Sequence, residues 1–76
     1  MTTPFTARQG QYLSFIHGFI VKHGVAPSFE EIGVHFGTTP PSVNNMIKTL
    51  DERGLLSRVP GVARSLRVLV PVAELP

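Results

Sequence analysis

Ser42, Asn44 and Asn45 place one hydroxyl and two amide groups close together in a segment that has the spacing of a helix. Side chains of these types form hydrogen bonds with base edges in the major groove of DNA. An asparagine that binds adenine through both amide atoms contributes about 1–3 kcal/mol of discrimination against other bases. On an isolated exposed helix the same residues would simply be solvated, so the prediction of base contact depends on the surrounding elements.

Cationic and hydroxyl side chains accompany this segment. Between residues 57 and 70 there are three arginines and no acidic residue, although the formal net charge of the whole chain is only +2. A local cationic strip on a weakly charged protein suits a polyanion such as the phosphate backbone of DNA, although it could equally be a solvated surface. We predict backbone contacts from Arg8, Thr39, Lys48, Thr49, Arg64 and Arg67.

The arginines also have simpler interpretations. Arg8 is either a phosphate contact or a solvated charge, and Arg64 either reaches a phosphate or a minor groove or is likewise solvated. Two further arginines on the predicted strands, Arg58 and Arg67, either contribute to a general positive field or form salt bridges with Asp51 and Glu52. The sequence leaves both alternatives open.

No arrangement of residues in the sequence predicts catalysis or metal binding. The three histidines are not accompanied by a cluster of acidic residues, and the chain contains no cysteine. No serine stands at a spacing from a histidine and an acid that indicates nucleophilic catalysis, and there is no glycine-rich phosphate loop. We therefore predict a protein that is not an enzyme and that uses no cofactor and no metal.

Size and composition set further bounds. A chain of 76 residues forms one domain with a small core, because short chains bury only about 60% of their unfolded surface. The absence of cysteine excludes a disulfide scaffold and fits a reducing cytoplasm. No apolar run approaches the roughly 20 residues that span a bilayer, so no membrane partner is expected. We place the domain at residues 1–70 and interpret residues 71–76 as a flexible tail or the start of a linker.

The first predicted helix spans residues 7–23. Thr6 and Gln9 have the spacing of a capping box, in which each side chain binds the backbone N–H of the other residue. Gly24 suits the position that follows the last helical residue. Apolar residues recur at the three- and four-residue spacing of a half-buried helix and are predicted to be core: Tyr12, Leu13, Phe15, Ile16, Phe19 and Ile20.

The second predicted helix spans residues 29–36. Ser28 and Glu31 form a second capping box, and Gly37 ends the helix. Gly33 is small enough to let a neighbouring helix approach closely.

The third predicted helix spans residues 40–53. It begins with Thr39 as the cap and Pro40 at the first helical position, and it stops at Gly54. Its apolar positions form one buried stripe, Val43, Ile47 and Leu50, which leaves the polar side chains facing outward.

A small hairpin follows. Residues 55–59 and 66–70 have the propensity of strands, and Pro60 and Gly61 between them mark a turn. The loop between the strands would form a wing. The order of elements predicts a mainly α fold with a small β-hairpin, namely a three-helix winged helix-turn-helix.

Over residues 4–69 the sequence resembles the N-terminal DNA-binding domain of LexA repressors. The resemblance rests on Phe-Thr-Ala-Arg-Gln at residues 5–9, His-Gly-Val-Ala-Pro-Ser at 23–28 and Pro-Ser-Val at 41–43. It continues with Ile-Lys-Thr-Leu at 47–50, Arg-Gly-Leu-Leu at 53–56 and Gly-Val-Ala-Arg-Ser-Leu-Arg at 61–67.

The resemblance implies a winged helix-turn-helix that binds a palindromic operator as a dimer and represses transcription. Carried over by position, it implies that Ser42, Asn44 and Asn45 face bases, that Arg8 and Lys48 approach the backbone, and that residues 61–64 form the wing tip. In LexA a C-terminal part supplies dimerisation and serine–lysine self-cleavage. We expect this chain either to be a fragment of such a repressor or to stand alone without that switch.

The sequence is compatible with two functions. The first is a sequence-specific transcriptional regulator, of repressor type, that binds double-stranded DNA as a homodimer in the bacterial cytoplasm, at the nucleoid. The alternative is a winged-helix module for protein–protein interaction within a larger assembly, supported by the modest net charge and by an expected exposed apolar tail over residues 68–75.

Overall fold

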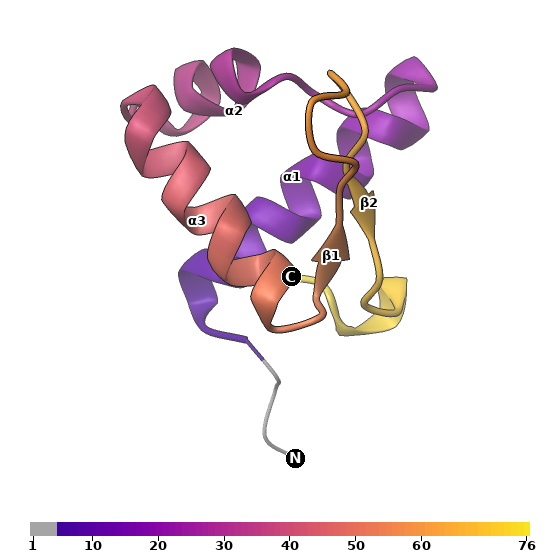
Figure 1. Ribbon diagram of the computed structural model, residues 1–76. Coiled ribbons are helices and arrows are strands. Elements are labelled where there is room, and N and C mark those ends of the chain that lie inside the picture. The colour runs from indigo at the N-terminus through magenta and orange to yellow at the C-terminus, as the bar shows by residue number, and fades with distance from the viewer. Residues whose placement is uncertain (1–4) are drawn as a thin grey trace.

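The computed structural model describes residues 5–76, so residues 1–4 of the predicted domain lie outside it. Three helices come first, α1 (Ala7–His23), α2 (Phe29–Phe36) and α3 (Pro40–Glu52). The antiparallel strands β1 (Leu56–Ser57) and β2 (Arg67–Val68) and a short 3-10 helix, Val72–Glu74, follow. Figure 1 shows α2 at the top with α3 descending from it, and the hairpin on the opposite side of the molecule. The predicted fold class is confirmed.

Both capping boxes are present. In α1 the Gln9 backbone N–H donates to Thr6 Oγ1 at 3.1 Å, and the Thr6 N–H donates to Gln9 Oε1 at 2.9 Å. In α2 the Glu31 N–H donates to Ser28 Oγ at 3.1 Å, and the Ser28 N–H donates to Glu31 Oε1 at 2.8 Å. These bonds satisfy donors that a helix N-terminus otherwise leaves free, which is why α1 and α2 begin where the sequence predicts.

The turn between α2 and α3 is tight. Gly37 adopts a left-handed conformation with φ of 63°, and the Thr38 N–H donates to the Gly33 carbonyl at 2.9 Å. Gly33 is buried, and a Cβ built on it would lie 3.1 Å from the Thr38 carbonyl oxygen and 3.5 Å from Val43 Cγ2. The missing side chain therefore allows the turn and the start of α3 to pack against α2.

Helix α3 ends one residue earlier than predicted. Arg53 is its C-cap and not part of the helix, and Gly54 follows with φ of 71°. The Leu55 N–H then donates back to the Leu50 carbonyl at 2.9 Å. Because the chain reverses at this left-handed glycine, Leu55 and Leu56 turn inward instead of continuing the helix.

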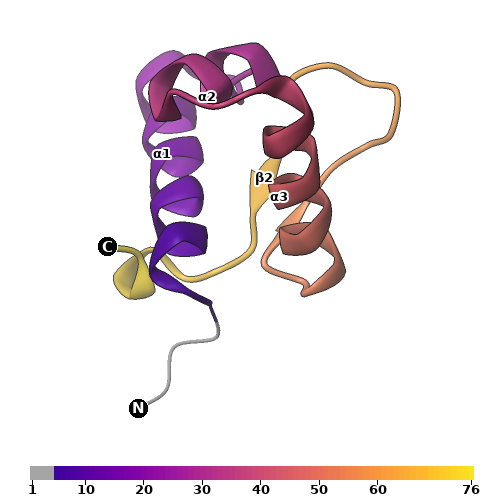
Figure 2. The ribbon, with the colours of Figure 1, turned by 90° about the vertical axis from the view of Figure 1, so that its left-hand side faces the viewer.

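The core lies between α1, α3 and the hairpin. The buried stripe predicted for α3, Val43, Ile47 and Leu50, has no exposed surface, and Leu13, Ile16 and Ile32 face it from the other helices. The remaining buried apolar residues are Tyr12, Ala26, Pro27, Leu55, Leu56, Leu66 and Val70. Figure 2 shows α1 and α3 on two sides of the molecule, with α2 crossing above them.

The strands are shorter than the sequence indicates. Only Leu56 with Val68 and Ser57 with Arg67 are paired, whereas five residues were expected on each side. Beyond Ser57, a side chain replaces the ladder, because the Val59 N–H donates to Ser65 Oγ at 2.9 Å and Ser65 Oγ donates to the Val59 carbonyl at 3.2 Å. We call residues 58–66, between the two strands, the wing loop.

The segment after β2 folds back on α1. Ser14 Oγ donates to the Pro76 carbonyl at 2.6 Å, and Leu75 packs against the core. The expectation of an exposed apolar tail over residues 68–75 is therefore wrong for three of its side chains: Val70 is buried, and Val68 and Leu75 are partly covered. Burial of these apolar side chains against the small core is more favourable in free energy than their exposure to water.

No helix in the described part of the chain is both long enough and apolar enough to cross a membrane.

Candidate nucleic-acid interface

One face of α3 is polar and exposed along its length. Ser42, Asn44, Asn45 and Lys48 are all exposed, whereas Val43 and Ile47 between them are fully buried. The buried side chains fix the rotation of α3 about its axis, so the structure brings the three predicted base-contacting residues onto its solvent side. Such a face has the groups and the width that a major groove accepts.

Thr39 organises the N-terminal end of this face. Its Oγ1 accepts a hydrogen bond from the Ser42 backbone N–H at 3.4 Å and donates one to Ser42 Oγ at 3.0 Å. Because Ser42 Oγ is the acceptor in the second bond, its own hydroxyl proton stays available to a base or phosphate acceptor. Thr39 is thus both the predicted cap and an orienting partner of Ser42.

Thr49 has less freedom than was expected of a backbone contact. It is half-buried, and its Oγ1 donates to the Asn45 carbonyl at 3.0 Å. Its predicted contact with DNA stays a prediction, as do the other predicted contacts.

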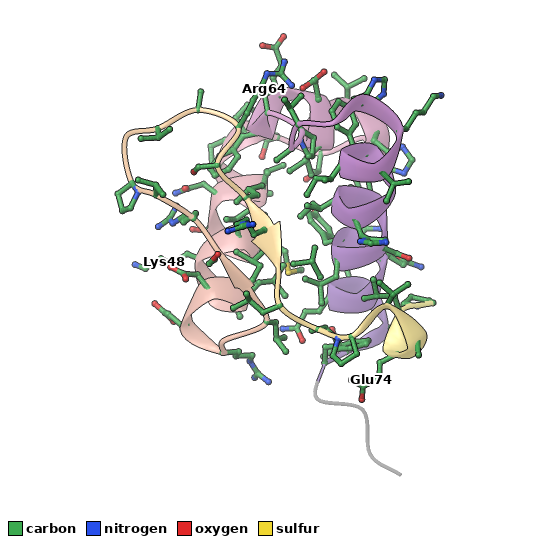
Figure 3. The ribbon with its side chains drawn as sticks, turned by 90° about the vertical axis from the view of Figure 1, so that its right-hand side faces the viewer. Lys48, Arg64 and Glu74 are labelled. Atoms are coloured by element: carbon green, nitrogen blue, oxygen red, sulfur yellow. The ribbon has the colours of Figure 1, made fainter. Side chains whose placement is uncertain are left out.

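The wing loop stands beside α3. Gly61 turns the loop with φ of 78°, and the Val62 N–H donates to the Val59 carbonyl at 3.1 Å. Gly61, Val62 and Ala63, the predicted wing residues, are all exposed. Figure 2 shows the loop extending outward next to α3, and Figure 3 shows Lys48 projecting from α3 on the same side of the molecule.

Arg64 does not point with the wing tip. Its Nη1 lies 2.6 Å from Glu31 Oε1 and donates to the Ala26 carbonyl at 3.2 Å. Figure 3 shows Arg64 at the top of the molecule by α2, away from Lys48. The sequence-based alternatives for Arg64 were contact with a phosphate or a minor groove and a solvated charge, and the structure adds a further arrangement, the ion pair with Glu31.

Arg8, Arg58 and Arg67 are each arranged differently. Arg8 lies over aromatic rings, with Cζ 4.8 Å from the centroid of Phe36, whose ring stacks on Tyr12 at 4.2 Å. Arg58 pairs with Asp51, with Nε 3.7 Å from Oδ2, as one of the sequence-based alternatives predicted. Arg67 on β2 is exposed.

Glu31 is a residue whose second role sequence reasoning missed. The sequence identified it only as a capping-box member, yet the same carboxylate also binds Arg64. The Ser28 N–H and the Arg64 guanidinium both hold the pKa of Glu31 below its usual value of 4.5. The sequence contains one indication of this second role: a carboxylate in a capping box retains lone pairs that can accept further hydrogen bonds. That indication does not identify a partner 33 residues away.

Within residues 5–76 no group of three histidine, cysteine or acidic side chains lies close enough together to hold a metal ion.

Comparison with known proteins connects this geometry to a family. Residues 2–65 match the family described as the LexA DNA binding domain. The chain is 43% identical over 70 residues to the LexA repressor of a Nocardioides species, which covers 91% of this chain and 28% of that protein. It is 38% identical over 65 residues to the LexA repressor of Zymomonas mobilis, covering 84% of this chain and 30% of that protein.

The LexA repressor of Rhodospirillum rubrum is 43% identical over 65 residues, which cover 26% of its length. The chain therefore spans less than a third of each of these relatives. The matched region contains α1, α2, α3 and nearly all of the wing loop. Because the match covers most of the chain and the structure is a winged helix-turn-helix, the chain belongs to the LexA DNA-binding domain family.

Proposed function

We propose that this chain binds double-stranded DNA sequence-specifically and serves as the DNA-binding domain of a LexA-type transcriptional repressor. The observation that carries the proposal is the exposed polar face of α3 next to an exposed wing loop. The names of the relatives support the same function, since each is called a LexA repressor.

The proposed binding mode places α3 in a major groove. Ser42, Asn44 and Asn45 would bind base edges, since hydroxyl and amide groups can both donate and accept hydrogen bonds there. Lys48, farther along the same face, would bind phosphate. The additional backbone contacts in this proposal come from Arg8, Thr39, Thr49 and Arg67, with the wing residues Gly61, Val62 and Ala63 against the flanking backbone. Arg64, which the sequence also suggested as a backbone contact, is bound to Glu31 and is not counted among them.

Repression would be steric. Two copies bound to a pseudo-palindromic site would contact half-sites about one helical turn apart, because a two-fold protein pair matches a two-fold sequence. A promoter covered in this way is closed to the transcription machinery. The proposal places the protein at the nucleoid, in the bacterial cytoplasm, and assigns it no catalytic step.

The test is selection from a random duplex library with the purified chain at two salt concentrations, followed by sequencing of the bound DNA. We expect an enriched pseudo-palindrome. If about four phosphates are contacted by each copy, log affinity should fall with log salt at a slope near −4 for each copy, from about −0.9 per phosphate. Weak binding that has no sequence preference and disappears with salt would indicate either a fragment that lacks its dimerisation part or the protein-interaction alternative.

A further inference from the structure

Arg64 links two parts of the chain that are distant in sequence. Its guanidinium binds Glu31, 33 residues earlier, and the carbonyl of Ala26, 38 residues earlier. The first partner is in the first turn of α2, and the second is in the segment that leads into α2. The wing loop is therefore tied to the N-terminal end of the helix-turn-helix at a point away from the hairpin strands.

The backbone at Arg64 is also unusual. Arg64 has φ of 55° and is the one residue other than glycine with a positive φ among residues 5–76. Residues with a Cβ rarely adopt this conformation, and long side chains have no intrinsic preference for it. The chain nevertheless adopts it at this residue, and the result is a side chain that turns back to α2 instead of following the loop outward (Figure 3).

Both bonds to Glu31 converge on one atom. Glu31 Oε1 accepts from the Ser28 N–H at 2.8 Å and from Arg64 Nη1 at 2.6 Å. A bond between a guanidinium and a carboxylate is shorter and stronger than one between neutral groups. The oxygen that caps α2 is therefore the oxygen that holds the wing loop.

We propose that Arg64 and Glu31 form a latch that positions the wing loop against the helix-turn-helix before DNA binds. In this arrangement Arg64 is a positioning residue, and its guanidinium stays on Glu31 in the complex. The benefit to binding is preorganisation, because a loop that is already fixed loses less conformational entropy when it contacts DNA. The inference rests on the proposed function only for its effect on affinity, since the latch itself exists in the free chain.

The competing role for Arg64 is direct contact with phosphate. To make that contact the guanidinium would have to leave Glu31, so Glu31 would oppose DNA binding. The two roles therefore predict opposite effects of removing the Glu31 charge.

A double-mutant cycle with Arg64→Gln, Glu31→Gln and the pair separates the two roles. Glutamine at position 31 keeps the capping box intact, because Gln9 performs the same function at the start of α1. We expect each single variant to weaken binding to the selected duplex about two- to fivefold, as expected for loss of a half-exposed ion pair. The double variant should bind no more weakly than either single one, and the salt slope should not change.

Two controls match these changes. Glu30→Gln removes the same charge from the neighbouring, exposed position and should leave affinity within about twofold. Arg67→Gln removes an exposed wing charge and should lower the magnitude of the salt slope by about 0.9 if Arg67 contacts phosphate. The latch is rejected if Glu31→Gln leaves affinity unchanged or raises it, while Arg64→Gln lowers both affinity and salt slope.

A measurement without DNA keeps the test independent of the proposed function. Backbone ¹⁵N relaxation of residues 59 and 61–63 should show lower order parameters in Arg64→Gln and Glu31→Gln than in the parent or Glu30→Gln. The helices of all variants should keep their order parameters, which shows that the fold survives. Unchanged wing-loop dynamics in both variants would reject the latch. If no duplex is selected by the parent chain, the proposed function fails, and this measurement still decides whether the latch exists.

Discussion

Helix α3 and the wing loop are held in place by different interactions. The inner face of α3 consists of three apolar side chains with no exposed surface, and burial of each contributes about 1.5–3 kcal/mol. The wing loop is held by a carbonyl contact, by the hydroxyl of Ser65 and by two partly exposed ion pairs, Arg64 with Glu31 and Arg58 with Asp51. Leu66, at its end, is the loop residue that is buried in the core. A partly exposed ion pair contributes about 0.2–1 kcal/mol.

Because α3 is held by apolar packing and the wing loop largely by charged and polar contacts, the two should respond differently to salt concentration. Apolar packing is nearly independent of ionic strength, whereas exposed charges are screened within roughly 10 Å at 0.1 M salt. Salt therefore weakens the attachment of the wing loop as well as its predicted phosphate contacts, and it leaves α3 in position. The following predictions test this comparison from its strongest element to its weakest.

Ile47→Ala removes a fully buried side chain from the inner face of α3. We expect a loss of about 2–5 kcal/mol in the free energy of unfolding, because the transfer and cavity terms add. Urea denaturation measures it, with Lys48→Ala on the exposed face as the control that changes stability by less than about 0.5 kcal/mol. Equal effects at the two positions would contradict the assignment of the two faces.

Asn44→Ala and Asn45→Ala test the outer face of the same helix. Each should reduce discrimination between the selected site and a scrambled duplex by about 1–3 kcal/mol, with no change in salt slope. The control is Val21→Ala on α1, where the side chain is exposed and apolar. Unaltered site preference in the Asn44→Ala, Asn45→Ala double variant would show that α3 does not bind bases as proposed.

Gly33→Ala tests the junction that places α3 on α2. The new Cβ would lie 3.1 Å from the Thr38 carbonyl oxygen, so the turn must shift, and we expect destabilisation of about 1–3 kcal/mol. Gly18→Ala on α1 is the matched control, since its Cβ meets nothing within 4 Å and alanine favours a helix by up to about 1 kcal/mol. Thermal unfolding of the pair should therefore show shifts of opposite sign.

Lys48→Gln and Arg64→Gln together compare an exposed cation with one that is held in an ion pair. Lys48 is exposed on the side of α3 next to the wing loop, so it should contribute about 0.9 to the magnitude of the salt slope. Arg64→Gln should leave that slope unchanged. Binding isotherms at four or more salt concentrations measure the slope for each variant. Identical slopes in the parent and in Lys48→Gln would show that Lys48 does not contact the DNA backbone.

The smallest expected effect is the dependence of stability on pH that follows from the lowered pKa of Glu31. Folding lowers this pKa below 4.5, first through the Ser28 N–H and then through Arg64, so the carboxylate contributes fully to stability above pH 4.5. That contribution is lost as the pH falls below 4.5 through the folded-state pKa. Carboxyl NMR titration should show a low pKa that rises only partly in Arg64→Gln, because the backbone bond remains. A pKa at the usual value in the parent chain would contradict the observed contacts.

The helix boundaries were predictable because local chemistry sets them. Thr6 with Gln9, Ser28 with Glu31, and Thr39 before Pro40 each act within a few residues, and all three starts are confirmed. The inner stripe of α3 was predictable from its spacing for the same reason.

The hairpin was harder to predict because its geometry depends on distant or unusual contacts. The strand lengths were overestimated, since nothing in the propensities of residues 55–59 indicates that Ser65 will replace the ladder with its side chain. The position of Arg64 depends on a left-handed backbone and on a carboxylate in α2. The three residues predicted to contact bases do lie on an exposed face. Which bases they would bind depends on a partner that the sequence does not contain.

The stack of Tyr12 on Phe36 has a practical consequence for these experiments. Tyr12 is the single tyrosine of a chain without tryptophan, and only 3% of it is exposed. Its ring lies parallel to that of Phe36, at the contact between α1 and α2. Intrinsic fluorescence therefore reports on the helical core and is blind to the wing loop. Opening of the loop should be optically silent, and global unfolding should not.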